Sequence, residues 1–416
     1  MFLCIDLKSF YSSVEAVERG LDPMSAKIVV ADPDRGKGTI CLAVSPALKS
    51  LGVKNRCRVY EIPNNIDYIM APPRMKLYLE YSARIYGVYL KYFSKDDIHV
   101  YSVDEVFIDT TPYENLYPIP ARELGIKIMQ DIKDTTGLRS TCGIGSNLYL
   151  AKIALDILSK HSSDFIGILD ENSYKNRLWH HRPLTDFWRV GIQTQKKLTS
   201  YGLMDMYDIA HANEDMLYHM FGKDAELLID HAWGRESVTM NDIKNYKSVF
   251  HSLSSGQVLL RDYSSKEAEL IIKEMADLLC LDMVRKSVVS QSINLYVGYS
   301  HLYDIKGSTG TVVLPVRTNS DRIIIPCLVS LYWQIVLTDL PVRMINISAN
   351  KIESDNNMQL NLFVDTDDLV RERKLQTAVN SIKSRYGKNS ILRGMNFEKH
   401  GTAIQRNAQI GGHKEG

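Results

Sequence analysis

The hydrophobic positions in the first part of the chain form short apolar runs and one long helical pattern. Phe2 to Leu7 is an apolar run broken only by Asp6, which predicts a buried strand that ends at a sheet edge. Residues 76–93 carry apolar side chains at three- and four-residue spacing, which predicts a long amphipathic helix. Two β-rich runs between residues 98 and 110 are joined by Val103-Asp104-Glu105, which predicts a hairpin with two carboxylates at its tip.

The pattern continues with a helix at 120–135, a strand at 140–144 and a helix at 148–159. Together with the first strand these elements follow the βαββαβ order of a split, ferredoxin-like fold. One large insertion, near residues 12–75, interrupts this order and contains two further strand-like runs around a polar Gly/Pro loop.

The second part of the chain predicts a helical segment followed by another mixed unit. Residues 166–235 are helical and short-looped, and the polar residues 236–247 are typical of a linker. Residues 248–350 repeat the βαββαβ order, with helices at 264–285 and 321–337. The tail, residues 351–416, is polar and charged, with helical spacing at 369–386 and an irregular pattern from 391 onward.

The composition is that of an ordinary globular protein, with 416 residues, 45% hydrophobic and 24% charged. The 50 Lys and Arg residues against 49 Asp and Glu residues leave a net charge of +1, which neither suggests nor excludes nucleic acid, because binding depends on where charge lies. Six scattered cysteines without a C-x-x-C pair indicate buried free thiols. We expect a cytoplasmic protein without a signal peptide or membrane contact, since the apolar stretch 323–337 is too short and too polar to span a bilayer.

Three carboxylates, Asp6, Asp104 and Glu105, are predicted to meet at one sheet edge, because the first strand and the hairpin are neighbours in a ferredoxin-like sheet. Clustered carboxylates raise one another's pKa unless a cation neutralises them. Mg²⁺ prefers such oxygen ligands, and two ions could activate an attacking hydroxyl and stabilise a leaving pyrophosphate. For Asp104-Glu105 alone, a solvated hairpin tip would be the better interpretation.

The residues around these carboxylates carry a family resemblance. The chain contains Ile5-Asp6-Leu7-Lys8-Ser9-Phe10-Tyr11, Tyr101-Ser102-Val103-Asp104-Glu105, Gly143-Ile144-Gly145-Ser146-Asn147 and Leu150-Ala151-Lys152-Ile153-Ala154. In this order, over essentially the whole chain, they resemble the motifs of the Y-family, or translesion, DNA polymerases, closest to the bacterial UmuC-like branch. The resemblance implies an α+β, multidomain right-hand polymerase: a ferredoxin-like palm (1–11 and 76–165), fingers (12–75), a helical thumb (166–235), a linker (236–247), a little finger domain (248–350) and a tail (351–416).

The resemblance also implies roles for the site residues. Asp6 and Asp104 would bridge two Mg²⁺ ions, the carbonyl of Leu7 would be a further ligand, and Glu105 would assist the ion nearer the primer. For the nucleotide, the family places binding residues at Phe10, Tyr11, Lys49 and Lys160.

Tyr11 stands at the steric gate, where a ring under the sugar leaves no room for a 2′-hydroxyl. The bland alternatives are core packing for Tyr11 and surface positions for Lys49 and Lys160. The chain also departs from many relatives, because Pro46 and Lys49 stand where a Tyr and an Arg are common.

Two further segments predict macromolecular partners. Arg189 to Gly202 resembles a helix–hairpin–helix, in which Gly191, Ile192, Lys196 and Lys197 would bind primer–template DNA through a helix N-terminus and added charge. Arg189 replaces the first glycine of the usual motif, and a simple helical turn stays an alternative. In the tail, Gln359, Leu360, Leu362 and Phe363 match the Q-L-x-L-F peptide by which bacterial polymerases dock on the sliding clamp.

Residues 367–416 contain ten Lys and Arg against five Asp and Glu, which suggests accessory repair proteins as partners or simply a solvated basic tail.

These features together predict a low-fidelity DNA-directed DNA polymerase that performs translesion synthesis from dNTPs, nucleoid-associated when engaged on DNA. One alternative is a non-catalytic, clamp-associated repair adaptor with a polymerase fold, against which the three carboxylates argue. A nucleotide cyclase on a similar palm is a second alternative. Its Gly-Gly-acidic hairpin is replaced here by Tyr101-Ser102-Val103.

Overall fold

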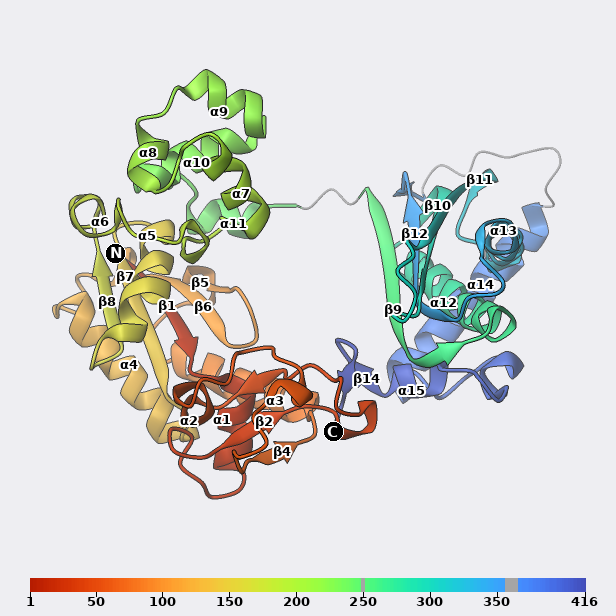
Figure 1. The fold of residues 1–416 in the computed structure, drawn as a ribbon, viewed down its shortest axis with the longest axis horizontal. Helices are drawn as coiled ribbons and strands as arrows, with labels where there is room; N and C mark the ends of the chain where they lie inside the picture. The colour runs from red at the N-terminus through yellow and green to blue at the C-terminus, as the bar shows by residue number, and fades with distance from the viewer. Residues whose placement is uncertain (248–250, 356–365) are drawn as a thin grey trace. The chain divides into compact units, whose positions relative to one another are not determined.

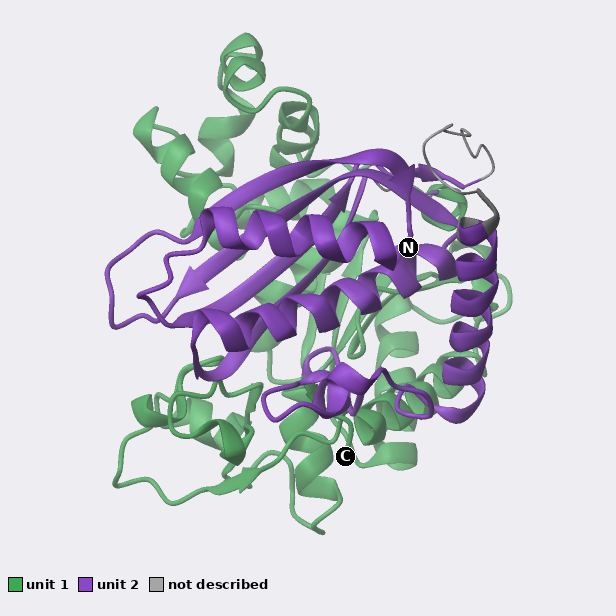
Figure 2. Cartoon of the chain, turned by 90° about the vertical axis from the view of Figure 1, so that its right-hand side faces the viewer, with its two compact units in different colours: residues 1–246, 413–416 green, residues 247–412 purple. Residues whose placement is uncertain are grey.

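The computed structural model describes residues 1–247, 251–355 and 366–416. The chain divides into two compact units, residues 1–246 with 413–416 and residues 247–412 (Figure 2). Each unit is built around hydrophobic cores of its own. The boundary between the units falls at the end of the segment predicted as a linker.

Unit 1 contains a five-stranded sheet in the order β5-β6-β1-β7-β8 (Figure 1). The central strand β1 runs antiparallel to both of its neighbours, and β8 runs parallel to β7. The order of the first four strands is ferredoxin-like, which confirms the predicted palm. The strands are β1 (Phe2–Leu7), β5 (Ile98–Val100), β6 (Glu105–Asp109), β7 (Ser140–Gly145) and β8 (Ile166–Leu169).

Residues 166–169 were expected to begin the helical thumb, but they form strand β8 of the palm sheet. The short run Ile166-Gly167-Ile168-Leu169 is apolar, and it pairs with β7 along residues 142–145. The sheet therefore gains a fifth strand beyond the split βαββαβ pattern.

Helices cover both faces of this sheet. Cys142 on β7 faces α4, because a Cβ atom on Gly125 would lie 3.3 Å from its Sγ. The next strand residue, Gly143, points to the opposite face, where a Cβ atom would lie 2.1 Å from the carbonyl oxygen of Ala151 in α5. The covering helices are α3 (Met75–Tyr89), α4 (Ala121–Thr136) and α5 (Leu148–Ile153).

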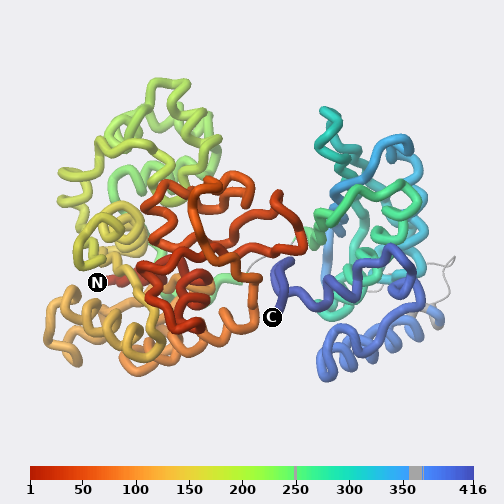
Figure 3. The backbone as a smooth tube through the Cα atoms, turned by 60° about the horizontal axis from the view of Figure 1, so that its bottom comes forward, coloured from red at the N-terminus to blue at the C-terminus, as the bar shows by residue number. Residues whose placement is uncertain are grey.

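The insertion after β1 forms a small sheet with its own core (Figure 3, red part of the tube). Strand β2 pairs in parallel with β4 and antiparallel with β3. Cys41 and Cys57, whose Sγ atoms lie 3.7 Å apart as free thiols, belong to this core. The elements are α1 (Phe10–Val17), β2 (Ile28–Val30), β3 (Ala43–Val44), α2 (Pro46–Ser50) and β4 (Ile69–Ala71).

Short helices follow β8, as the sequence predicts for the thumb. They are α6 (Glu171–Leu178), α7 (Ile192–Ser200), α8 (Met206–Ala210), α9 (Glu214–Phe221), α10 (Asp224–Ala232) and α11 (Met240–Asn245). The last of them lies within the predicted linker. Thr239 and Asp242 form its capping box, and the apolar Met240 is buried in unit 1. Lys244 donates to the carbonyl oxygens of Lys95 and Ile98, so most of this segment is docked rather than free.

Unit 2 has the predicted βαββαβ element order, but its strands are arranged differently from those of unit 1. The sheet order is β11-β10-β12-β9, so the first strand lies at an edge and the last strand is internal. Hydrophobic periodicity predicts each element but contains no information on which strands pair. The elements are β9 (Ser252–Tyr263), α12 (Ser265–Arg285), β10 (Val288–Tyr299), β11 (Ser308–Thr318), α13 (Asp321–Ile335) and β12 (Val342–Asn350).

Residues 366–412 of the tail pack on α12 and belong to unit 2, whereas residues 413–416 belong to unit 1, so the described tail does not form a separate solvated segment. The predicted helix is α14 (Thr366–Tyr386), and the region predicted as irregular contains η8 (Gly394–Phe397), α15 (Ala403–Asn407), β14 (Gln409–Ile410) and β15 (His413–Lys414). Glu274 of α12 accepts hydrogen bonds from Asn396, Thr402 and Ala403.

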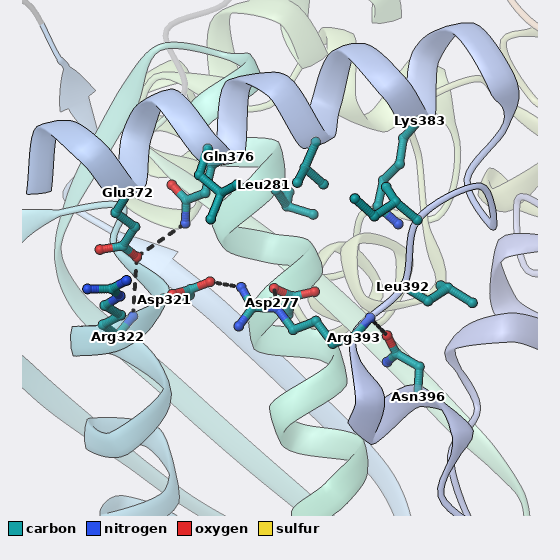
Figure 4. A pocket seen from close by; sticks show the side chains of 13 residues that line it. Asp277, Leu281, Asp321, Arg322, Glu372, Gln376, Lys383, Leu392, Arg393 and Asn396 are labelled. Carbon is teal, nitrogen blue, oxygen red and sulfur yellow. Dashed lines mark hydrogen bonds and ion pairs between the residues drawn. The ribbon is translucent and has the colours of Figure 1, made fainter. Parts of the chain in front are cut away.

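A cavity of about 350 Å³ lies between α12, α14 and residues 391–396 (Figure 4). Arg393 forms ion pairs there with Asp277 and Asp321. These polar contacts, which no periodicity reveals, fasten the tail to the unit.

Within the described residues, no helix is long and apolar enough to cross a membrane.

Candidate active site

The pairing of β1 with β6 brings the predicted carboxylates together. Asp6 lies opposite Glu105 in the antiparallel register, so both side chains project from the same face of the sheet. Asp104 precedes β6, and its carbonyl oxygen accepts a hydrogen bond from the amide of Leu7 at 3.0 Å. The carboxylate of Asp104 is in turn held by the hydroxyl of Ser102, at 2.5 Å. The three residues therefore lie at neighbouring positions at one end of the β1–β6 pair.

The surroundings of Asp6 raise its pKa in the way expected of a cation site. Burial raises the pKa of Asp6 to about 7, and the charges of Asp104 and Glu105 add to this effect. An ionised Asp6 is thus costly without a nearby positive charge. Carboxylate and carbonyl oxygens are the donors that Mg²⁺ prefers, so the donor set fits this ion.

The side chains are nevertheless not gathered around one point. Among the residues that the structure describes, no group of three or more His, Cys, Asp or Glu side chains is arranged to hold a metal ion. Glu105 is instead paired within the protein: its Oε1 lies 2.7 Å from Nζ of Lys152 and accepts a hydrogen bond from Cys4 Sγ at 3.2 Å. Burial and the neighbouring Glu105 raise the pKa of Cys4 well above its usual range, so this thiol stays protonated and can donate.

Lys152 is a site residue to which the sequence motif alone assigned no role. It belongs to α5, which is otherwise apolar from Leu148 to Ile153, and it is only 7% exposed. A lysine flanked by buried apolar residues signals a paired cation, because lysine is almost never buried unpaired. The sequence therefore indicated that Lys152 is paired, but it did not show which residue is the partner.

Tyr11 lies beside the carboxylates, on α1. Its ring stacks on Tyr78, with 4.5 Å between ring centroids and 20° between planes. The hydroxyl of Tyr78 donates to Glu15 at 2.8 Å, which holds the ring of Tyr78 in place. Burial and the charge of Asp104 raise the pKa of Tyr11, consistent with a position close to that carboxylate. Phe10, also predicted to contact nucleotide, is itself buried and only 3% exposed.

The two predicted phosphate-binding lysines are exposed and lie close enough to Asp6 for their charges to interact. Nζ of Lys49, on α2, donates to the hydroxyl of Ser9 at 2.8 Å, and Nζ of Lys160 lies 3.0 Å from Asp156. Burial lowers the pKa of Lys49, with Asp6 and Lys160 acting in opposite senses. A third cation, Lys8, was not predicted. Its pKa is lowered by burial and then by the charges of Lys49 and Lys160, so the three ammonium groups are close enough to repel one another.

The predicted helix–hairpin–helix has the expected turn. Gly191 is the N-cap of α7, and Arg189, at the position where a glycine is usual, adopts a left-handed φ of 68°. This backbone conformation explains why glycine is common there. Lys196 is exposed, whereas Lys197 donates to the carbonyl oxygen of Met220 and is therefore already engaged. The predicted clamp peptide, residues 359–363, lies outside the described residues.

The palm sheet thus has acidic residues at one edge and lysines close to them. The impB/mucB/samB family model matches residues 5–156, and the model of that family's C-terminal domain matches residues 250–362.

Curated relatives match along nearly the whole chain. UvrX of Bacillus subtilis (strain 168), described as a UV-damage repair protein, is 32% identical over 99% of this chain and 97% of its own. DNA polymerase IV 2 of the same organism is 28% identical over 98% of this chain and 97% of its own. Among solved structures, a Y-family DNA polymerase chimera of Dbh and Dpo4 matches with a TM-score of 0.66, at 20% identity, over 86% of this chain and 99% of that chain.

The chain therefore belongs to the impB/mucB/samB family, the Y-family DNA polymerases. This confirms the predicted family, the right-hand polymerase fold class and the enzyme class of DNA-directed DNA polymerase. The roles of individual residues stay predictions.

Proposed function

We propose that this chain extends a DNA primer across damaged template positions, using Asp6, Asp104 and Glu105 to hold two Mg²⁺ ions. The observation that carries the proposal is the register of β1 and β6, which pairs Asp6 with Glu105 and leaves Asp104 at the strand end. The elevated pKa of Asp6, about 7, supports the need for a cation at this position.

Each side chain has a defined task in this proposal. When bound, the two ions supply activation of the primer 3′-hydroxyl and stabilisation of the leaving pyrophosphate. The three carboxylates and the carbonyl of Leu7 hold those ions. Lys49 and Lys160, joined by Lys8, offset the negative charge of the triphosphate as point charges.

Two further contacts complete the substrate complex. Tyr11, supported from below by Tyr78, lies under the sugar and excludes a 2′-hydroxyl. The amides at the N-terminus of α7, behind Gly191 and Ile192, receive a DNA phosphate, and the exposed Lys196 adds charge. Such phosphate contacts position the duplex without reading its sequence.

The proposal is tested by primer extension with Asp104→Ala, and Asp109→Ala serves as the comparison. Asp109 lies at the far end of β6, where its carboxylate accepts a hydrogen bond from the amide of Thr111. We expect Asp104→Ala to lower kcat by roughly 10²- to 10³-fold or more, because a group that acts on transition-state charge is lost. Asp109→Ala should extend primers at the wild-type rate. Undiminished extension by Asp104→Ala would remove the metal assignment.

Two partners belong to the same proposal. The Q-L-x-L-F peptide would attach the polymerase to a sliding clamp by presenting Leu362 and Phe363 to an apolar pocket. The basic tail would serve accessory repair proteins, although part of its charge is used within unit 2, where Arg373 pairs with Asp355 at 2.6 Å.

A further inference from the structure

A chain of charges joins the carboxylate cluster to one of the phosphate-binding lysines. Nζ of Lys152 lies 2.7 Å from Oε1 of Glu105 and 3.0 Å from Oδ2 of Asp156. The other oxygen of Asp156, Oδ1, lies 3.0 Å from Nζ of Lys160. The order Glu105–Lys152–Asp156–Lys160 thus alternates in sign and runs from the proposed metal site to the proposed triphosphate site.

Lys152, Asp156 and Lys160 lie on one helical stretch, at a spacing that brings their side chains together. Lys152, Asp156 and Lys160 follow one another at four-residue intervals along a continuous helical stretch, α5, the π-helical turn η5 (Ala154–Leu158) and the turn η6 (Ser159–His161). Side chains four residues apart are neighbours on a helix surface. Single π-helical turns inside helices occur frequently at functional sites.

Burial strengthens the ion pairs of Lys152 in the middle of this chain of charges. The exposed Lys160 at its far end can change partner. The side chain of Lys152 is 9% exposed, that of Asp156 24% and that of Lys160 48%. A buried ammonium group must be paired, and Lys152 has two carboxylates within 3.0 Å. Lys160, in contrast, is free to exchange Asp156 for a triphosphate oxygen, since it is half in solvent.

We propose that Lys152 is a positioning residue that competes with the divalent ion for Glu105 and, through Asp156, links metal binding to the release of Lys160. The ion and Lys152 are both cations that use the same carboxylate of Glu105. When the ion takes Glu105, Lys152 keeps Asp156 as its remaining partner. Asp156 then holds Lys160 less strongly, and Lys160 becomes available to the triphosphate. This inference rests on the proposed function, because it takes Glu105 as a metal ligand.

Two substitutions should change metal affinity in opposite directions. Lys152→Met removes the competing cation, so divalent-ion binding should tighten by roughly three- to tenfold, because the ion no longer has to displace an ammonium group from Glu105. Asp156→Asn leaves Glu105 as the only carboxylate partner of Lys152, so the ion should bind several-fold more weakly. A purely structural Lys152 would give no such opposition of signs.

The measurement uses the full chain bound to a primer–template whose primer ends in a dideoxynucleotide, so that no turnover occurs. Free Mn²⁺ is determined by electron paramagnetic resonance during titration, with DNA alone as the blank. Circular dichroism shows that each variant is folded, and Lys152→Arg, which keeps the charge, should bind Mn²⁺ within about twofold of the wild type. Unchanged or weaker Mn²⁺ binding by folded Lys152→Met would overturn the inference.

Asp104→Ala in the same titration separates this inference from the proposed function. If Asp104→Ala binds Mn²⁺ as the wild type does, the metal site itself is wrong. If Asp104→Ala loses Mn²⁺ binding while Lys152→Met and Asp156→Asn leave it unchanged, the metal site stands and only the role of Lys152 fails.

Discussion

At the scale of single residues, Tyr11 joins a predicted role in sugar selection to a defined support. Its ring rests on Tyr78, which is fully buried and anchored through its hydroxyl to Glu15. Glu15 also accepts from Arg74 at 2.8–2.9 Å, so the platform beneath Tyr11 is held by an ion pair. A rigid lower ring makes the upper ring a fixed obstacle rather than a movable one.

Substituting Tyr11 should therefore change the selection between dNTPs and NTPs. We expect Tyr11→Ala to lower the ratio of kcat/KM values for the two sugars by roughly 10- to 100-fold, because the obstacle to a 2′-hydroxyl is removed. Tyr11→Phe keeps the ring and should keep the ratio. Single-nucleotide incorporation with each triphosphate measures both, and an unchanged ratio in Tyr11→Ala would show that another group excludes ribonucleotides.

The residues of the site were predictable in proportion to how local their signal is. Asp6, Asp104 and Glu105 stand next to strand patterns that place them at one edge, so their meeting follows from the sequence. The pairing of Lys152 with Glu105 joins residues 47 positions apart across a helix–sheet contact, which no pattern contains. Lys8 was missed for the same reason, since its neighbours Lys49 and Lys160 come from distant parts of the chain.

At the scale of elements, the seat of α5 on the sheet depends on glycines. A Cβ atom on Gly143 would lie 2.1 Å from the carbonyl oxygen of Ala151, and one on Gly145 would lie 2.1 Å from the amide nitrogen of the same residue. These contacts are with backbone, which cannot turn aside. The Gly-Ile-Gly run thus lets α5 approach closely enough for Lys152 to reach Glu105.

Gly145→Ala should destabilise unit 1 by about 3 kcal/mol, because α5 must move away from β7 to admit a methyl group. Gly87→Ala is the matched control, since Gly87 lies in α3 with nothing within 4 Å of its Cβ position. That change should stabilise the unit by up to about 1 kcal/mol through helix propensity. Denaturant unfolding of both variants gives the two free energies, and equal values would contradict the close-approach argument.

Helices with an apolar face were predicted close to their bounds, whereas the polar contacts that dock them were not predicted. The helix predicted at 76–93 is α3 (Met75–Tyr89), and the helix predicted at 264–285 is α12 (Ser265–Arg285). In the tail, the helix α14 was predicted at 369–386 but its docking was not: Glu372 and Gln376 are buried, and the hydroxyl of Ser320 donates to Glu372 at 2.6 Å. Hydrophobic periodicity finds this helix but does not show the buried polar groups through which it docks.

At the scale of the whole molecule, the net charge of +1 conceals a separation of charge. Lys8, Lys49 and Lys160 lie close to the acidic palm edge, while the tail cations Arg373 and Arg393 are ion-paired within unit 2. Arg393, for example, bridges Asp277 and Asp321. Because the net charge is close to zero and part of the positive charge is paired internally, we expect the intrinsic affinity for DNA to be modest and sensitive to salt.

A polymerase with modest DNA affinity gains most from a tether, because attachment raises the local concentration of DNA. We expect the double substitution Leu362→Ala and Phe363→Ala to leave extension without clamp unchanged. With clamp, product length should fall several-fold, to the clamp-free level, since the apolar anchor of the Q-L-x-L-F peptide is lost. Asn361→Ala, at the variable position of the motif, is the control and should respond to clamp like the wild type. Extension products resolved by length, with and without clamp, decide the matter: full clamp stimulation of the double variant would mean that attachment runs through another surface.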